Sequence, residues 1–157
     1  MKLRDHIIEQ LAAMVVGDHP AFPYRSSSFI TRFFKRCGLP FVHDGTTRSY
    51  WTAERLKEIN LGPSNTHDLP SCDILRVLSE LFDHSDFDRT EKSRDDALDH
   101  LNKLLNRQGF VAYFDESGNC QLRNNGTGTN SLTVLGQRRP LAEEEIAQRA
   151  KVVKFLT

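Results

Sequence analysis

The sequence predicts a mainly α-helical domain that ends in one β-hairpin, an α+β arrangement built around a helical bundle. Five segments within the first 108 residues place apolar side chains at helical spacing. One segment after residue 109 instead alternates its side chains with period two around a tight turn. The chain has 157 residues, of which 38% are hydrophobic and 27% charged, so it has the composition of a globular protein with room for one domain or two very small ones.

Residues 2–16 predict the first helix. Asp5 and Glu9 interrupt the apolar pattern and no small-residue cleavage site follows, so this segment is interpreted as a helix rather than a secretory signal. Gly17 and Pro20 are expected to end it. The residues at helical spacing are Leu3, Ile7, Ile8, Leu11, Met14 and Val15.

The segment RSSSFITRFFKRCG, residues 25–38, predicts the second helix. Its serines offer side-chain oxygens that can accept hydrogen bonds from the free N–H groups of a first turn. Gly38 is expected just beyond the helix end, where a left-handed backbone is common. The expected apolar face consists of Phe29, Ile30, Phe33, Phe34 and Cys37.

A third helix is predicted over residues 46–63. The pair Asp44-Gly45 before it is a strong turn signal, and Thr46 or Thr47 is expected to cap the helix. A Gly-Pro pair stops it, and either Tyr50 or Trp51, near its start, is expected to face the core.

Two more helices are predicted over residues 70–82 and 93–108, the second capped by Ser93 and ended by Gly109. The segment FDHSDFDRTEKS between them is expected to be exposed. A hairpin over 110–123 follows, with the turn ESGN. Two helices followed by a hairpin have the element order of a winged helix, so the second half of the domain is expected to resemble one.

The chain is therefore divided into three parts. Residues 1–124 are expected to form one helical domain with its closing hairpin, and the polar stretch 125–140 a flexible linker. Residues 141–157 are expected to form a helix, because glutamates stand in its first turn and lysines in its last, as the helix dipole favours. This last helix is expected to be a connector to something else.

Charge is zero overall but unevenly distributed. Residues 24–57 carry seven basic and two acidic residues, whereas residues 58–101 carry four basic and eleven acidic residues. Three interpretations remain open at this point. The blocks attract each other, they face different partners, or they form two solvated faces of one domain.

Cysteine usage and hydropathy indicate the compartment. The three cysteines, Cys37, Cys72 and Cys120, are isolated and odd in number, which is typical of a reducing cytoplasm. No apolar run approaches the roughly 20 residues that a membrane-spanning helix needs, so no membrane partner is expected. We expect a cytoplasmic protein, and no pattern specifies its oligomeric state.

Motifs for catalysis and cofactor binding are missing from the sequence. NNGTGTN lacks the Gly-Lys-Ser/Thr of a phosphate loop, and no Cys-x-x-Cys or His-Glu-x-x-His spacing occurs. The acidic stretch FDHSDFDRTE does not have the spacing of a calcium loop. The adjacent residues His43 and Asp44 have the types of a base and its orienter, but neighbours in sequence seldom make that pair well. We therefore expect a protein that is not an enzyme and binds no metal or cofactor.

The basic block gives the best candidate for binding nucleic acid or another anion. Arg48 stands in the first turn of an expected helix, where the dipole disfavours a cation. Asp44, an acid of residues 58–101 or an external anion should compensate it, and we favour the internal role. The candidate residues are Arg25, Arg32, Lys35, Arg36, His43, Thr46, Thr47 and Arg48.

The expected helix 93–108 is a poorer candidate for reading a DNA groove. It begins with Asp95, Asp96 and Asp99, and carboxylates at that end would repel phosphates. A winged-helix shape there would serve packing or protein contact.

The order of these features resembles a known family. It runs through SSSFITRFFKRCGLPFVHDGTTRSYWTAERLKEIN, an acidic spacer with ILRVLSELFD, and ALDHLNKLLNRQGFVAYFDESGNCQLR. Over about residues 25–124, this resembles the N-terminal recognition domain of AbiJ-type bacterial abortive-infection proteins. The resemblance implies a sensor of phage infection that precedes an effector, often a HEPN ribonuclease domain. The Arg-x-x-x-x-His motif of such nucleases does not occur in this sequence.

The expected function is thus a non-enzymatic sensor or regulatory module of a bacterial antiphage system. It would recognise a phage-related trigger and control an effector domain or protein. Two alternatives remain: a nucleic-acid-binding module that uses the basic 25–57 face, and a protein-interaction adaptor that uses the acidic 58–101 face.

Overall fold

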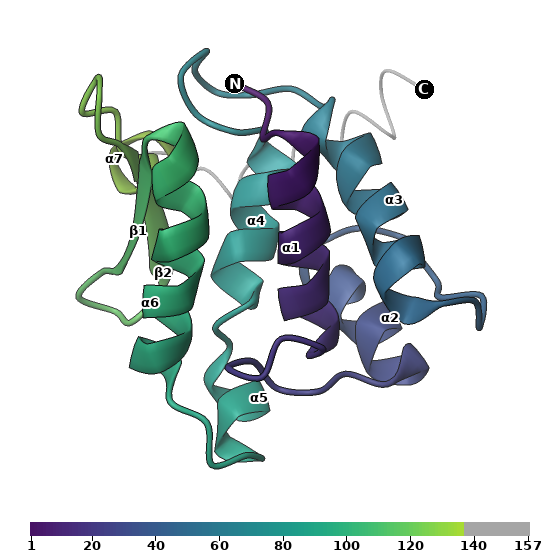
Figure 1. Ribbon diagram of the computed structural model, residues 1–157. Coiled ribbons are helices and arrows are strands. Elements are labelled where there is room, and N and C mark those ends of the chain that lie inside the picture. The colour runs from purple at the N-terminus through teal and green to yellow at the C-terminus, as the bar shows by residue number, and fades with distance from the viewer. Residues whose placement is uncertain (137–157) are drawn as a thin grey trace, which may run out of the picture.

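Figure 1 shows the computed structural model, which describes residues 1–136. It is mainly helical with a small two-stranded antiparallel sheet, so the predicted fold class is confirmed. The expected helix 141–157 lies outside the described residues. The elements are α1 (Asp5–Val16), α2 (Ser27–Arg36), α3 (Arg48–Asn60), α4 (Cys72–Glu80), α5 (His84–Asp88), α6 (Arg94–Leu105), η1 (Asn106–Gln108), β1 (Phe110–Phe114), β2 (Cys120–Asn124) and α7 (Ser131–Gly136).

The helices pack around α1 and α4. Helix α1 packs against α3 on one side and α6 on the other, and α4 contacts both α2 and α3 (Figure 1). The hairpin covers the remaining side, with β1 on α6 and β2 on α4. No helix within residues 1–136 is both long and apolar enough to cross a membrane.

The core is made largely by the apolar stripes that the sequence periodicity predicts, although Phe29 of the expected face of α2 is only half-buried and lies outside the core. Ile7, Ile8 and Leu11 of α1 are completely buried. At the start of α3 the core takes Trp51, while Tyr50 is exposed, which decides between the two aromatic residues. Burial of side chains of this size contributes about 1.5–3 kcal/mol each to folding.

The hairpin pairs antiparallel strands in the register Phe110↔Asn124, Ala112↔Leu122 and Phe114↔Cys120. Phe110 and Ala112 of β1 are buried, whereas Val111 and Tyr113 are only half-buried, so one face of the strand is turned toward the core. Asp115 forms the turn, because its Oδ1 accepts hydrogen bonds from the backbone N–H groups of Ser117 and Asn119.

Two of the expected helix caps are wrong. Ser93 caps α6, since its hydroxyl accepts from the Asp96 N–H at 3.2 Å. The N-cap residues of α2 and α3, Ser26 and Thr47, make no such bond. The Ser26 hydroxyl interacts with that of Ser28 instead, and the Thr46 hydroxyl donates to Asp44.

The segment that was expected to be exposed between α4 and α6 is partly buried. It contains α5, in which Asp86 and Phe87 lie in the interior. The Asp83 carboxylate caps this short helix by accepting from the Ser85 N–H at 3.1 Å. A helix of five residues is too short to show a helical period in the sequence. The sequence therefore did not indicate that Asp86, unlike the neighbouring acids, points inward.

The first part of the expected linker lies on the domain. The Thr127 and Thr129 hydroxyls both donate to Oδ2 of Asp68, which precedes α4. These hydrogen bonds hold the pKa of Asp68 well below its usual range. The Asn124 amide donates to the Asp68 carbonyl at 2.8 Å, and Ser131 is buried. Residues 125–136 are thereby fastened to the domain, and 137–140 lie outside the described residues.

Stability is expected to fall as the pH drops below about 6.5, because of His19 in the link between α1 and α2. Its ring packs on that of His100 in α6 at a centroid distance of 4.9 Å, and its Nδ1 accepts from the Ala21 N–H. Burial lowers the pKa of His19, the charges of His100 and Lys92 lower it further, and Asp96 opposes them. The unfolded chain then binds the proton more readily, so acid favours unfolding.

Urea titrations at pH 7.5 and pH 5.5 would measure this effect. His19→Asn keeps an acceptor for the Ala21 N–H but does not titrate, so it should lose less stability between the two pH values than the wild type. Equal losses would exclude His19 as the source. The difference should be modest, because the ring is only half-buried.

Candidate functional site

The basic and acidic blocks of the sequence meet in an ion cluster around Asp86. Arg25, from the link before α2, places Nη2 at 2.6 Å from Oδ2 of Asp86. Arg36, at the end of α2, reaches the same oxygen at 2.8 Å, and Arg89 reaches Oδ1 at 3.1 Å. Of the three interpretations of the charge blocks, mutual attraction within one domain therefore describes this contact.

Asp86 and Arg25 are the buried centre of the cluster, with side chains 4% and 1% exposed. Burial alone would raise the pKa of the Asp86 carboxyl, but the charges and hydrogen bonds of Arg25 and Arg36 outweigh it and hold the pKa below its usual value. Arg25 also donates to the Val15 carbonyl at 2.7 Å and lies over the Phe33 ring. Its guanidinium is thus enclosed by the fold and does not face an external anion.

Arg48 has an internal role, but its partners differ from the expected ones. It donates to the carbonyls of Val16 and Arg25 and to Oδ1 of Asp18 at 3.3 Å. Val16 is the last residue of α1, where carbonyls have no partner within the helix, and Asp18 follows it, whereas Arg25 belongs to the link before α2. Asp44 instead accepts from the Thr46 N–H and hydroxyl, which closes the turn before α3.

His43 belongs to the packing of the loop before α3. Its ring is 8% exposed, forms a hydrogen bond with the Ser27 hydroxyl at 2.5 Å, and meets Trp51 edge-to-face. The backbone N–H of His43 donates to the Thr31 hydroxyl. These contacts fix the loop against α2.

The eight candidate residues therefore do not form one surface. Arg25 and His43 are buried, and Arg36 and Arg48 hold carboxylates or carbonyls of the domain. Thr46 and Thr47 lie in the exposed turn before α3. On α2, Arg32, Lys35 and Arg36 are all exposed, and Arg32 lies over the Phe29 ring.

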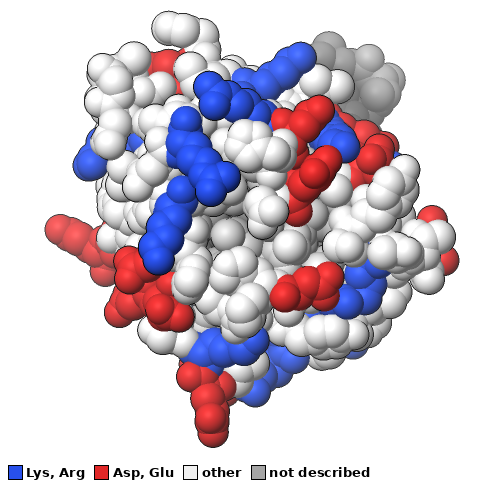
Figure 2. Space-filling view, in the orientation of Figure 1, with Lys and Arg blue, Asp and Glu red and all other residues white. Residues whose placement is uncertain are grey.

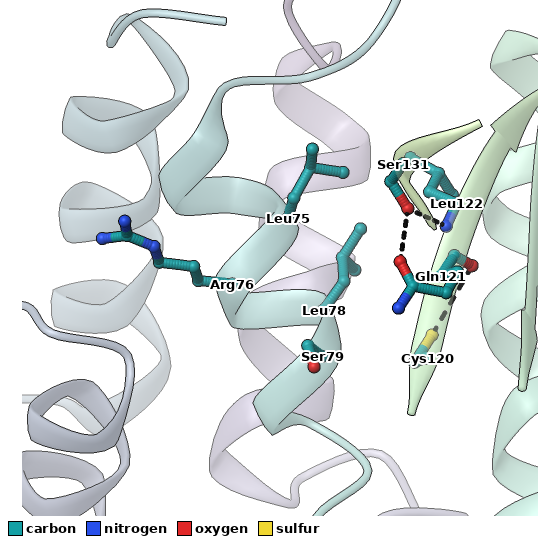
Figure 3. A pocket seen from close by; sticks show the side chains of 8 residues that line it. All are labelled: Leu75, Arg76, Leu78, Ser79, Cys120, Gln121, Leu122 and Ser131. Atoms are coloured by element: carbon teal, nitrogen blue, oxygen red, sulfur yellow. Dashed lines mark hydrogen bonds between the residues drawn. The ribbon is translucent and has the colours of Figure 1, made fainter. Parts of the chain in front are cut away.

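A cavity of about 150 Å³ lies between α4 and β2, and no pattern in the sequence predicted it. Figure 3 shows Leu75 and Leu78 on one wall and the strand residues on the other, while the Arg76 side chain points away. Its lining residues are Leu75, Arg76, Leu78, Ser79, Cys120, Gln121, Leu122 and Ser131.

A hydrogen-bond chain joins this cavity to α7. The Ser131 hydroxyl donates to Oε1 of Gln121 at 2.8 Å and accepts from the Leu122 N–H at 2.8 Å (Figure 3). The Gln121 amide in turn donates to Oδ2 of Asp115 in the hairpin turn. The first residue of α7 is therefore fixed by a side chain of the cavity wall.

The cavity offers shape and hydrogen bonds rather than a reactive group. Burial raises the pKa of the Cys120 thiol to about 12, so the thiol stays protonated and a weak nucleophile near neutral pH. Within residues 1–136, no three His, Cys, Asp or Glu side chains come together as metal ligands would. Asp86, in the acidic stretch, points into the ion cluster with Arg25.

Comparisons with protein families, with characterised proteins and with solved structures find no match for this chain. The likeness to the AbiJ-type recognition domain therefore stays a prediction.

Proposed function

We propose that this chain is a non-enzymatic regulatory module, of the sensor type expected in a bacterial antiphage system in the cytoplasm. In this proposal a phage-related trigger acts on the domain and changes how α7 is held. The chain after α7 then passes the change to an effector, for which a HEPN ribonuclease is one candidate.

The position of Ser131 is the observation that carries this proposal. It lines the α4–β2 cavity, it bonds to Gln121 and Leu122, and it begins the helix from which residues 137–157 continue. A group that entered the cavity would displace or reorient Gln121. The hydrogen bonds that fix the start of α7 would then be altered.

The energies involved suit a switch. A single hydrogen bond contributes about 0.5–1.5 kcal/mol net, so the attachment of α7 through Ser131 is worth a few kcal/mol at most. A ligand that binds one state about tenfold more tightly than another shifts their ratio by the same factor, or about 1.4 kcal/mol. A modest binding preference is thus enough to change the population of docked α7.

The two alternative functions have less support. A nucleic-acid site on the 25–57 face would need Arg25, Arg36 and Arg48, whose guanidinium groups already hold carboxylates or carbonyls of the domain. An adaptor on the 58–101 face would use acids of which Asp86 and Glu80 already bind arginines.

Phage plating tests the proposal. The native locus, carried in a susceptible bacterium, should lower plating of at least one phage in a diverse panel, and deletion of this chain should restore plating. Ser131→Ala removes the acceptor of the Leu122 N–H and should either abolish protection or slow growth without phage. Thr133→Ala, an exposed change on the same helix, should leave protection unchanged.

A second variant separates a switching defect from a folding defect. Ser131→Ala is expected to lower the free energy of unfolding by about 1–3 kcal/mol, because it leaves a buried N–H unsatisfied. Ser79→Met narrows the cavity without touching Ser131 and should impair the response to phage while the melting temperature stays near that of the wild type. Plating that does not depend on the chain, or a Ser131→Ala phenotype equal to that of Thr133→Ala, would contradict the proposal.

A further inference from the structure

A run of exposed cations lies at the end of the fold where α6 meets the N-terminus. Helix α6 is polarised along its length: Asp95 and Asp96 are exposed in its first turn, and Lys103 is exposed in its last. Arg107 follows in η1 and is also exposed. In Figure 2, basic side chains lie over the upper half of α6 and near the start of α1, with acidic side chains below them and to their right.

Gln108 brings the N-terminus to this run. Its amide donates to the Lys2 carbonyl at 2.6 Å, and its Oε1 accepts from the Arg4 N–H at 3.0 Å. Lys2 and Arg4 are exposed, so four cations from two distant parts of the sequence meet at one end of the molecule.

These cations differ from Arg25, Arg36 and Arg48 of the basic block in having no carboxylate partner within residues 1–136, a property that they share with Arg32 and Lys35 of α2. Within residues 1–136, Lys2, Arg4, Lys103 and Arg107 take part in no ion pair, although Asp5 follows Arg4 at the start of α1. Arg36 and Arg48, by contrast, are bound to acids of the domain.

We propose that the basic run formed by Lys2, Arg4, Lys103 and Arg107 binds the phosphate backbone of a nucleic acid. The four charges come from two segments that Gln108 joins, with Lys103 and Arg107 on successive turns, and such a spread of charge suits a chain of phosphates better than a single anion. Lys103 and Arg107 are four residues apart across the junction of α6 and η1, or about 6–8 Å along the helix axis. Phosphates follow one another at about 3.4 Å per strand along a duplex, so such cations can meet alternate phosphates.

This inference deepens the proposed function, because it names nucleic acid as the class of trigger or partner. Only the role of the nucleic acid as trigger or partner rests on the proposed function. Four phosphate contacts predict strong salt dependence. The logarithm of the binding constant should fall with the logarithm of salt concentration with a slope of about −3 for a single strand and about −3.6 for a duplex. Recognition would be largely independent of base sequence, since contacts to phosphates carry no sequence information directly.

Fluorescence anisotropy with the full chain tests the inference. The probes are labelled 20-nucleotide single strands and 20-base-pair duplexes of DNA and RNA, titrated from 50 to 200 mM salt. Lys103→Gln/Arg107→Gln should weaken binding roughly tenfold and reduce the magnitude of the salt slope by about 1.4–1.8, as expected for two lost contacts. Arg32→Gln/Lys35→Gln removes the same charge from the rival surface on α2 and should bind within twofold of the wild type.

Three outcomes would overturn the inference. They are no binding by the wild type at 50 mM salt, equal or greater loss in the α2 variant, and binding to phosphatidylserine vesicles or polyglutamate in place of nucleic acid. Melting temperatures of all variants ensure that each is folded. Failure here leaves the plating result intact, and failure of the plating test leaves a measured nucleic-acid affinity intact, so the two proposals fail separately.

Discussion

Replacing Asp86 by asparagine is expected to lower the free energy of unfolding by about 3–5 kcal/mol, which is the usual result of removing one partner of a buried ion pair. The side chain of Arg25 is 1% exposed and depends on Asp86 for its only carboxylate contact within residues 1–136. Asparagine is similar in size and can still accept a hydrogen bond, so the loss comes mainly from the charge. Arg36 loses less, because Glu80 and Asp83 also contact it.

The loss should shrink in acid. The pKa of Asp86 in the folded chain lies below its usual value of 3.8, so the ionised carboxylate stabilises the fold fully above that pH. This contribution disappears as the pH falls through the folded-state pKa. Wild type and Asp86→Asn should therefore converge in stability at low pH and differ most near neutrality.

Urea unfolding at pH 7 measures the difference, and Asp88→Asn serves as its control. Asp88 is an exposed residue of the same short helix, so its replacement should change stability by less than about 0.5 kcal/mol. The double variant Arg25→Met/Asp86→Leu should recover part of the loss, because apolar replacement of a whole buried pair is often tolerated. Equal effects of Asp86→Asn and Asp88→Asn would show that the cluster contributes little.

Much of the fold follows from local patterns in the sequence. The apolar period of residues 2–16 and of 93–108 predicts α1 and α6, and Ser93 caps α6 as its position before the helix predicts. The alternating segment after Gly109 predicts the hairpin. Each of these signals lies within one window of the chain, where side-chain spacing alone determines which face is buried.

Contacts between distant segments could not be predicted in the same way. Arg25 and Asp86 are 61 residues apart, and nothing in the stretch around Asp86 distinguishes this acid from Asp83 or Asp88. The guanidinium of Arg48 similarly takes acceptors at the end of α1, which become available only when the helices pack. Charge blocks counted along the sequence therefore did not show which cations are engaged within the domain.

The two proposed sites show the same limit. The α4–β2 cavity is lined from three elements, and its Ser131 belongs to a stretch that was interpreted as a linker. The basic run joins residues 2 and 4 to residues 103 and 107 through the side chain of Gln108. Counting charges in short stretches of sequence cannot show that such distant positions are neighbours, whereas the hydrogen bonds of the folded chain show it.

Gly17→Ala is expected to lower the free energy of unfolding by clearly more than the cost of placing alanine in a left-handed backbone conformation. Gly17 ends α1 with φ at 81°, a left-handed conformation that costs an L-residue about 1–2 kcal/mol. A Cβ there would also lie 2.2 Å from the Pro23 carbonyl oxygen and 2.3 Å from the Tyr24 Cα, closer than atoms can approach. These are backbone atoms, so the whole link that carries Phe22 and Arg25 would have to move.

Gly45→Ala separates the two contributions. Gly45 has nearly the same φ, 84°, but a Cβ there meets nothing within 4 Å, so its loss should be about 1–2 kcal/mol. In the Gly17→Ala variant, displacement of the link would also remove the burial of Phe22 and the contact of Arg25 with Asp86. Urea midpoints should therefore order the variants as wild type, Gly45→Ala and then Gly17→Ala, with the last unfolded or nearly so at room temperature. If the two alanine variants had equal midpoints, the close approach of the link to the end of α1 would not be a constraint on this fold.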